Sequence, residues 1–405
     1  MHIAQRARDT EPFHALAFGQ RAAALEAAGH HVVKLSIGEP DFGAPPAVRE
    51  AMREAMDGRP LPYTPALGLP ALRDALARFY REKHGVIVDP ARIAITSGAS
   101  AALLLVTAAT TDPGDEVLLA DPSYPCNREL VRSFGGTPVL VRTSAASRYQ
   151  LDVAAVADAW SDRTTAVMIA SPSNPTGTSI PPAELAAICD LVRARDVWRI
   201  VDEIYLDLAD HDARGTPART VLAHDPDAVV IGSFSKYFGM TGWRLGWAVL
   251  PEALVPVVER LAMNYFLCAS APAQQAALAA FTPESLALCE ERRVELTARR
   301  RLVLDGLAAI GLPVPVEPDG AFSVYIDVSG TGMDAWRFCE EVLQHAHVSL
   351  TPGRDFAVAT ADTHVRLSYA ASRADLSEGI ARVGAFLAAR RGAADTGGRV
   401  PLSTR

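Results

Sequence analysis

The chain has 405 residues, of which 49% are apolar and 21% are charged, and its formal net charge is −8. That composition is typical of a folded globular protein of two or three domains, and its acidic balance offers no basic surface for nucleic acid. The longest apolar run (99–109) is too short to span a bilayer, and the N-terminus lacks the apolar core of a secretory signal. The five cysteines are scattered and form no CxxC pair, so they indicate neither disulfides nor a zinc site. We therefore expect a cytoplasmic protein without metal, membrane or nucleic-acid partners.

Strand and helix signals alternate through most of the chain. Short apolar, β-branched runs predict strands, and helical patterns lie between several of them. The alternation is typical of an α/β fold with a mostly parallel sheet and helices on both faces. The predicted strands are 92–96, 116–120, 138–141, 166–170, 198–201, 229–232 and 245–250, and the predicted helices are 100–110, 182–194 and 251–262.

The pattern changes near Gly311, where the alternation ends. Beyond it, two predicted strands (321–328 and 365–368) flank a predicted helix (334–345), which indicates a smaller α+β domain. The sequence thus predicts four parts. They are an N-terminal segment (1–45) that packs on the small domain or on a partner, a large domain (46–310), a small C-terminal domain (311–391) and a disordered tail (392–405).

Lysine is rare in this chain, because only Lys34, Lys83 and Lys236 occur among 39 basic residues. Chemistry that needs a primary amine therefore has three candidates. Lys236 follows a predicted strand and is accompanied by Ser233, Ser235 and Arg244. Two hydroxyls and a guanidinium can bind a phosphate, and a lysine between them can form a Schiff base with an aldehyde that the phosphate anchors. An exposed loop lysine is the alternative interpretation.

The segment Ser233-Phe-Ser-Lys-Tyr-Phe-Gly-Met-Thr-Gly-Trp-Arg-Leu-Gly246 resembles the class I/II aminotransferases, which are pyridoxal 5′-phosphate (PLP) enzymes of fold type I. The resemblance runs from about residue 33 to 389 and implies a large domain with a seven-stranded sheet. It also implies that Lys236 is the Schiff-base lysine and proton shuttle. The implied reaction moves an amino group from an L-amino acid to a 2-oxo acid by a ping-pong mechanism.

Further motifs follow in the order of this family. Asp202 ends the strand 198–201, where open α/β sheets bind ligands, and resemblance assigns it to the pyridine nitrogen. Tyr205 and Asn174, the latter in Ser171-Pro-Ser-Asn-Pro-Thr-Gly177, resemble the two partners of the phenolic oxygen. A solvated strand-end loop and an ordinary turn are the alternative interpretations, and the sequence leaves open whether Asn174–Pro175 is cis.

The remaining cofactor residues lie nearer the N-terminus. Thr96-Ser-Gly-Ala-Ser100 joins a predicted strand to a helix, and Gly98, Ala99 and Ser100 resemble the other half of the phosphate site. Tyr124 matches the aromatic residue that stacks on the pyridine ring. Tyr63 resembles the tyrosine that reaches the phosphate of the neighbouring subunit, which implies a homodimer with shared active sites.

Substrate recognition is implied by two further matches. Arg366, in His364-Val-Arg-Leu-Ser-Tyr369, resembles the arginine that binds the substrate carboxylate, and Gly38 and Asn174 resemble substrate contacts. Some relatives that use acidic substrates have a lysine where this chain has Ser100. Phe18, Tyr265 and Phe266 lie in segments that often line the side-chain pocket, but core packing explains each equally well, so the amino donor stays open.

Parts of the sequence also fit three other functions. The GxGxxA motif at Gly330–Ala335 suggests a dinucleotide site, but the acidic residue expected about 20 positions later is missing. A PLP-binding transcription regulator needs a helix-turn-helix domain, and only about 30 residues precede the strand before Gly38. A PLP-dependent lyase or cyclase, such as a C–S β-lyase or an aminocyclopropanecarboxylate synthase, shares the Lys, Asp, Asn, Tyr and Arg set and is the remaining alternative.

Overall fold

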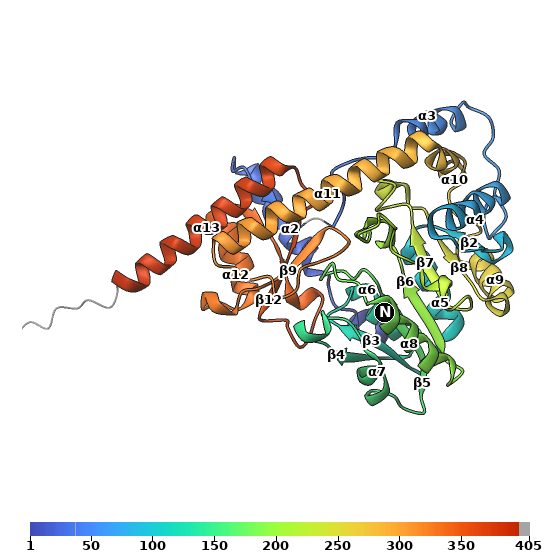
Figure 1. Cartoon of the computed structure of the whole chain (residues 1–405), viewed down its shortest axis with the longest axis horizontal. Coiled ribbons are helices and arrows are strands. Elements are labelled where there is room, and N and C mark those ends of the chain that lie inside the picture. Colours follow the sequence, from blue (N-terminus) through green and yellow to red (C-terminus); the bar gives the residue numbers. More distant parts are fainter. Residues whose placement is uncertain (37, 397–405) are drawn as a thin grey trace, which may run out of the picture. The chain divides into compact units, whose positions relative to one another are not determined.

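The computed structural model describes residues 1–36 and 38–396, which form two compact units (Figure 1). The large unit contains residues 1–12, 39–295 and 318–321. The small unit contains the described residues of 13–38, together with 296–317 and 322–396. In these described parts of the chain, no helix is long and apolar enough to cross a membrane, and no cluster of His, Cys, Asp and Glu side chains could hold a metal ion.

A seven-stranded sheet in the order β2-β8-β7-β6-β5-β3-β4 is the centre of the large unit. Its strands are β2 (Ile93–Thr96), β3 (Glu116–Asp121), β4 (Thr137–Arg142), β5 (Thr164–Ala170), β6 (Trp198–Asp202), β7 (Val229–Ser233) and β8 (Gly246–Val249). In this sheet β8 is antiparallel to β2 and β7, while the other neighbouring strands are parallel. The mostly parallel seven-stranded sheet is therefore confirmed.

The register of the sheet brings several loops to one edge. Ala170 of β5 pairs with Asp202 of β6, and Asp202 pairs with Ile231 of β7, so the carboxyl ends of these three parallel strands lie side by side. In open α/β sheets, ligands bind outside the carboxyl ends of the strands. The loops that follow β5, β6 and β7 are therefore where a site is expected.

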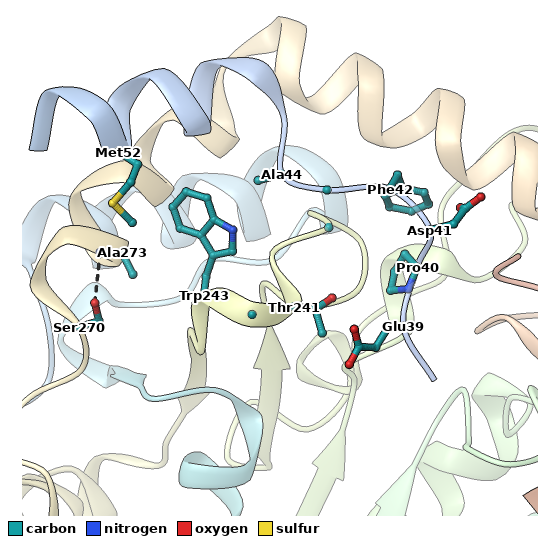
Figure 2. Close-up of a pocket in the computed structure, with 13 residues that line it drawn as sticks. Glu39, Pro40, Asp41, Phe42, Ala44, Met52, Thr241, Trp243, Ser270 and Ala273 are labelled. Carbon is teal, nitrogen blue, oxygen red and sulfur yellow. Dashed lines mark hydrogen bonds between the residues drawn. The ribbon is translucent and has the colours of Figure 1, made fainter. Parts of the chain in front are cut away.

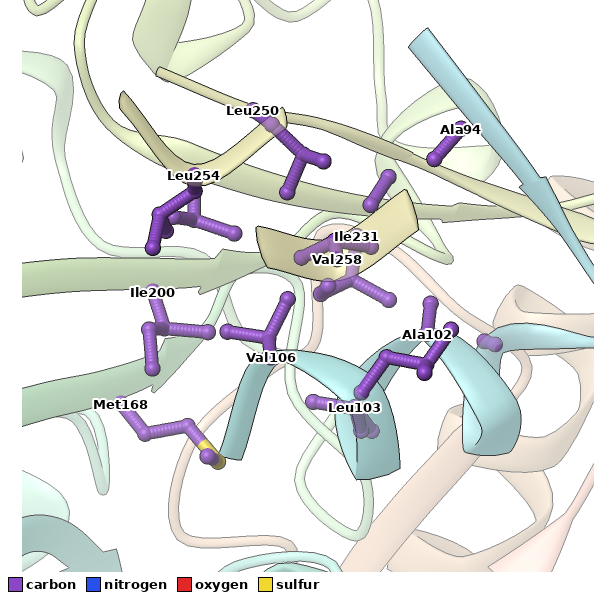
Figure 3. Close-up of a cluster of buried hydrophobic side chains, with 14 of the residues drawn as sticks. Ala94, Ala102, Leu103, Val106, Met168, Ile200, Ile231, Leu250, Leu254 and Val258 are labelled. Atoms are coloured by element: carbon purple, nitrogen blue, oxygen red, sulfur yellow. The ribbon is translucent and has the colours of Figure 1, made fainter. Parts of the chain in front are cut away.

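Apolar side chains between α5 (Ala99–Thr110), α9 (Val255–Tyr265) and the sheet form the core of the large unit (Figure 3). Val106, Ile200, Ile231 and Val258 meet there and are almost completely buried. Each such side chain contributes about 1.5–3 kcal/mol through burial, which anchors α5 against the strands. The other helices of this unit are α1 (Gln5–Asp9), α3 (Pro46–Ala55), α4 (Pro70–His84), α6 (Pro125–Ser133), α7 (Val153–Asp158), α8 (Pro182–Arg193) and α10 (Ala271–Ala277).

The small unit is an α+β arrangement. Its antiparallel sheet has the order β11-β12-β9, and a short parallel pair joins β1 to β10. These strands are β1 (Val33–Lys34), β9 (Ser323–Asp327), β10 (Val348–Ser349), β11 (Thr351–Pro352) and β12 (His364–Ser368), and the helices are α2 (His14–Ala27), α12 (Ala335–Glu341) and α13 (Arg373–Thr396). The Asp334 carboxylate accepts the backbone N–H of Arg337 and caps α12, so the GxGxxA motif forms a loop and a helix cap.

The compact units divide the chain differently from the predicted domains. Helix α11 (Pro283–Ala309) begins in the large unit and ends in the small one, and residues 1–12 belong to the large unit. A continuous helix carries no turn residues that would mark such a boundary in the sequence. The predicted tail begins at Gly392, whereas α13 continues to Thr396, and residues 397–405 of that tail lie outside the described residues.

Candidate active site

The N-terminus of α5 meets the segment that follows β7 at Gly98. A Cβ atom on Gly98 would lie 2.5 Å from Nη2 of Arg244, so a larger residue there would displace this guanidinium. Arg244 Nη1 also donates to Ser235 Oγ over 3.5 Å and to the Thr241 carbonyl over 2.9 Å. The φ angle of Gly98 is 86°, which glycine adopts readily. A guanidinium, a hydroxyl and a helix N-terminus thus converge, which is a donor set suited to a phosphate.

The other residues predicted for this phosphate site lie around the same point. Ser233 is buried at the end of β7, and its Oγ accepts the backbone N–H of Ser235 over 3.0 Å. In the first turn of α5, Ala99 is buried and Ser100 is exposed. The hydroxyl of Ser233 therefore shapes the loop in this structure, while Ser100 presents its side chain to the surface.

Asp202 is a buried carboxylate at the carboxyl end of β6. Burial raises its pKa to about 6, although a hydrogen bond from the Ile204 N–H (3.0 Å) and the positive charge of Lys236 both act to lower it. The ionised form is therefore only partly compensated by the protein. A further positive charge placed beside Asp202 would be favourable.

Lys236 and two tyrosines belong to the electrostatic environment of this carboxylate. The Lys236 Nζ lies 5.9 Å from the centre of the Tyr205 ring, and Tyr205 itself is buried. Burial raises the pKa of Tyr124, and its neighbours Cys126, Tyr205 and Asp202 add to the effect. The structure thus brings Lys236, Asp202, Tyr205 and Tyr124 into one electrostatically coupled group.

Asn174 lies in the loop after β5 and is half-buried. The Asn174–Pro175 peptide bond, whose isomer the sequence left open, is cis. The Ser171 N–H at the start of this loop donates to the Asp202 carbonyl over 3.1 Å. The loop that carries Asn174 is therefore attached to the end of β6.

Tyr63 differs from the other predicted cofactor residues, because its side chain is 80% exposed. A tyrosine with this exposure contributes little packing to its own chain. Its predicted role at a neighbouring subunit needs an exposed side chain, and that role stays a prediction.

The predicted substrate residues Arg366 and Gly38 lie together in the small unit. Arg366 is buried on β12, and its Nη2 donates to the Ser36 carbonyl over 2.7 Å and to Thr351 Oγ1 over 3.3 Å. A Cβ atom on Gly38 would lie 3.8 Å from Arg366 Nη1. Ile37, which belongs to the same predicted loop, lies outside the described residues.

A cavity of about 630 Å³ adjoins the segment that carries Arg244 (Figure 2). Thr241 lines it and also donates from Oγ1 to the Ser235 carbonyl over 3.1 Å, so one wall of the cavity belongs to the segment that carries Ser235 and Arg244. In Figure 2, Trp243 points toward Met52 of α3. The lining residues are Glu39, Pro40, Asp41, Phe42, Gly43, Ala44, Met52, Gly239, Thr241, Gly242, Trp243, Ser270 and Ala273.

The sequence alone did not identify Thr241 and Cys126 as neighbours of the predicted site residues, and it left open whether Phe18 belongs to the core. Thr241, which contacts both Arg244 and Ser235, was visible within the Lys236 motif but was not singled out. Cys126, beside Tyr124, gave no signal of its own. Phe18 is fully buried, with its ring 5.2 Å from the Trp336 ring, so it is part of the core of the small unit.

Residues 30–383 match the family Aminotransferase class I and II, and the chain belongs to this family. The chain is 39% identical over 376 residues to a valine–pyruvate aminotransferase of Mycobacterium tuberculosis, which covers 93% of this chain and 96% of that protein. It is 36% identical over 382 residues to an aspartate/prephenate aminotransferase of Thermus thermophilus, which covers 94% of this chain and 97% of that protein.

Solved structures agree with this assignment. A crystal structure of an aminotransferase from Mycobacterium tuberculosis matches with a TM-score of 0.91 and 39% identity, covering 96% of this chain and 100% of that one. The aspartate aminotransferase of Thermus thermophilus with maleate matches with a TM-score of 0.89 and 34% identity, covering 95% and 99%. The protein is therefore an aminotransferase with the fold type I architecture.

Proposed function

We propose that the large unit binds PLP and that the enzyme transfers an amino group from a neutral L-amino acid to a 2-oxo acid by a ping-pong mechanism. One observation carries this proposal. Ser235, Arg244 and Gly98 converge at the N-terminus of α5, Asp202 ends β6, and Lys236 lies in the segment that follows the adjacent strand β7. These residues fit a group that has a phosphate at one end and a protonated ring nitrogen at the other.

Each predicted residue then has a defined part in holding the cofactor. When bound, PLP supplies an aldehyde and an electron-withdrawing ring that stabilises negative charge at the substrate Cα. Asp202 keeps the ring nitrogen protonated, because its buried negative charge is only partly compensated by the protein and gains from a positive charge beside it. Gly98, Ala99, Ser100, Ser233, Ser235 and Arg244 bind the phosphate, Tyr124 lies against the ring, and Asn174 and Tyr205 bind the phenolic oxygen.

Lys236 is the covalent anchor of the cofactor and the proton carrier. With PLP bound, the Lys236 Nζ would accept the proton from the substrate Cα and return it at C4′, the aldehyde carbon of the cofactor. Arg366 binds the α-carboxylate through two parallel hydrogen bonds and fixes the direction of the Cα–H bond. Gly38 leaves space for the substrate beside this guanidinium. Asn174 makes a further contact with the substrate.

A neutral amino donor is favoured by the position of the charges. Lys34 and Lys83 are held in ion pairs with Glu26 (2.8 Å) and Glu290 (2.7 Å), so neither is available to a second carboxylate of the substrate. The described residues that line the cavity of Figure 2 include Glu39 and Asp41 but no lysine or arginine. The relative of 39% identity is named for valine and pyruvate, which are the first donor and acceptor to test.

A homodimer in the cytoplasm completes the proposal. Tyr63 reaches the phosphate of the partner's cofactor, and the nearby exposed residues Met56 and Leu61 would gain from burial at an interface. The five cysteines are free, which suits a reducing compartment.

The test is a half-reaction in the PLP-loaded protein. With an amino donor alone, the visible absorbance is expected to disappear in about one turnover per site, and a 2-oxo acid should restore it. Borohydride reduction of the resting protein should tag the Lys236 peptide alone. Continuous release of ammonia, a thiol or a cyclised product without loss of the absorbance would favour a lyase or cyclase. A tag on Lys34 or Lys83 would contradict the anchor.

A further inference from the structure

Lys83 extends from the last turn of α4 into the interior of the large unit. Its side chain is only 13% exposed, and its Nζ lies 2.7 Å from Glu290 Oε1 and 3.3 Å from Asp207 Oδ1. Lysine is rarely this buried unless its charge is paired. Two carboxylates from different elements therefore meet at one ammonium group.

Asp207 connects Lys83 to the turn that carries Tyr205. The 3₁₀ turn Leu206–Leu208 contains Asp207 and directly follows Tyr205. The Tyr205 carbonyl accepts the Leu208 N–H over 2.9 Å. Burial acts to raise the pKa of Asp207, but Lys83 and His84, whose Nε2 lies 3.2 Å away, lower it to about 2. Asp207 is thus ionised, and the ion pair fixes the turn after β6.

Glu290 connects Lys83 to the segment that carries Lys236. The Tyr237 hydroxyl, on the residue after Lys236, donates to Glu290 over 2.6 Å, and the Lys83 Nζ lies 3.8 Å from the centre of the Tyr237 ring. Burial acts to raise the pKa of Glu290, but Lys83, Tyr237 and Arg293 lower it to about 2. Lys83 therefore holds the segment after β7 through a charge pair and a cation–π contact.

The same cluster extends to the residue after Asp202. Glu203 is buried, accepts the Thr220 hydroxyl and the Val221 N–H (both 2.6 Å), and interacts electrostatically with His84 and Asp207. Burial raises the pKa of Glu203 to about 7. The charged groups around Lys83 are Asp207, Glu290, Glu203, His84, Arg293 and, beyond Glu290, His211.

We propose that Lys83 is a positioning residue of the active site. Through its ion pairs with Asp207 and Glu290 it connects the turn after Tyr205 to the segment that carries Lys236. This connection fixes the position of the Tyr205 hydroxyl relative to the Lys236 amine. The inference rests on the proposed function. Lys83 does not touch substrate or cofactor in this proposal and acts through Asp207 and Glu290. A displacement of about 1 Å at a reacting group can cost on the order of 10²-fold in rate, so such a tie affects turnover directly.

The decisive comparison is between Lys83→Met and Arg199→Met. Arg199 also forms a buried ion pair in the large unit, with Nε 2.8 Å from Asp225 Oδ2, but it lies on β6 three residues before Asp202, toward the other end of the strand. Both variants remove one cationic partner of a buried carboxylate, so both lose stability. Only Lys83→Met breaks a connection to Tyr205 and Lys236.

Four quantities are measured for both variants after loading with PLP: Tm, kcat, KM for one donor, and the pH midpoint of the visible absorbance. Lys83→Met is expected to lower kcat by on the order of tenfold or more with little change in KM. The midpoint should move to higher pH, because Lys83→Met removes a positive charge that lies against Tyr237, the residue after Lys236, and the protonated form of the Lys236 nitrogen then meets less repulsion. Lys83→Arg keeps the positive charge, so its pH midpoint should lie close to that of the wild type.

Several outcomes would overturn the proposal. If Lys83→Met and Arg199→Met change kcat and the midpoint equally, Lys83 is only structural. If Lys83→Met does not fold, Lys83→Met/Glu290→Gln removes both charges together, and a wild-type kcat in that protein also refutes the tie. Failure of the proposed function is seen separately, because wild-type protein would then show neither visible absorbance with PLP nor a borohydride tag on Lys236.

Discussion

Asp202 illustrates how burial prepares a single side chain for a cationic partner. Its pKa is raised to about 6 because burial removes water from the carboxylate. Only a hydrogen bond from Ile204 and the charge of Lys236 compensate for that loss. The ionised form then gains more from a protonated pyridine than an exposed carboxylate would. The same burial makes the pairing dependent on pH.

We predict that the affinity for PLP rises with pH through about 6, because Asp202 is protonated below that value in the cofactor-free protein and ionised above it. The measurement is the Kd of PLP between pH 5 and 8 for the wild type and for Asp202→Asn. The phosphate of PLP titrates equally in both proteins, so the difference between the two curves isolates Asp202. Identical curves would contradict the pairing.

Asp202→Asn should also lower kcat by on the order of 10³-fold, about 4 kcal/mol of transition-state stabilisation, because an unprotonated ring is a weaker electron sink. Part of the affinity for PLP should remain, since Arg244 and Ser235 still bind the phosphate. Single-turnover rates of the half-reaction give the effect without product release. Turnover close to that of the wild type would disprove the role of Asp202.

At the scale of elements, the sequence predicts strands better than the contacts between the loops that follow them. Apolar runs such as 198–201 identify the strand that ends at Asp202, because local periodicity reflects burial on the sheet. Lys83, Asp207 and Glu290 meet although they are far apart in the chain, and no local pattern records such a contact. The glycine-rich segment around Arg244 predicted a phosphate site, but not that its guanidinium would lie against Gly98.

The close approach of β8 to α5 gives a prediction at this scale. A Cβ atom on Gly246, which pairs with Thr96 and Ser233, would lie 2.6 Å from the Ala99 nitrogen and 2.7 Å from the Gly98 carbonyl carbon. Backbone cannot yield easily, so Gly246→Ala should cost about 1–3 kcal/mol of the free energy of unfolding. Gly246→Ala should also weaken the binding of PLP, because the added methyl group displaces the N-terminus of α5.

Gly242→Ala is the matched control for this prediction. Gly242 belongs to the same segment, and an added Cβ would meet no atom within 4 Å. Its free energy of unfolding should stay within about 0.5 kcal/mol of the wild type. Chemical denaturation of the two cofactor-free variants makes the comparison, and equal stability would show that β8 and α5 can separate without cost.

At the scale of the whole molecule, the proposed chemistry is divided among separate parts of the chain. Lys236, Asp202 and the phosphate-binding residues belong to the large unit, and Arg366 and Gly38 belong to the small unit. Within the small unit, hydrogen bonds to Ser36 and Thr351 orient the Arg366 guanidinium. In the proposed homodimer the partner subunit contributes a further group, Tyr63, which the single chain leaves 80% exposed.

The homodimer with shared sites predicts complementation between two defective proteins. Lys236→Ala removes the anchor and should be inactive, and Tyr63→Phe removes a phosphate contact and should be partly active. In a hybrid dimer one site then carries both defects and the other carries neither, because Tyr63 acts on the site of the other subunit. Activity per wild-type lysine should therefore rise above that of Tyr63→Phe alone after the subunits have exchanged. Exchange is verified with a tag on one protein. If hybrid dimers form and activity does not rise, Tyr63 serves the site of its own chain.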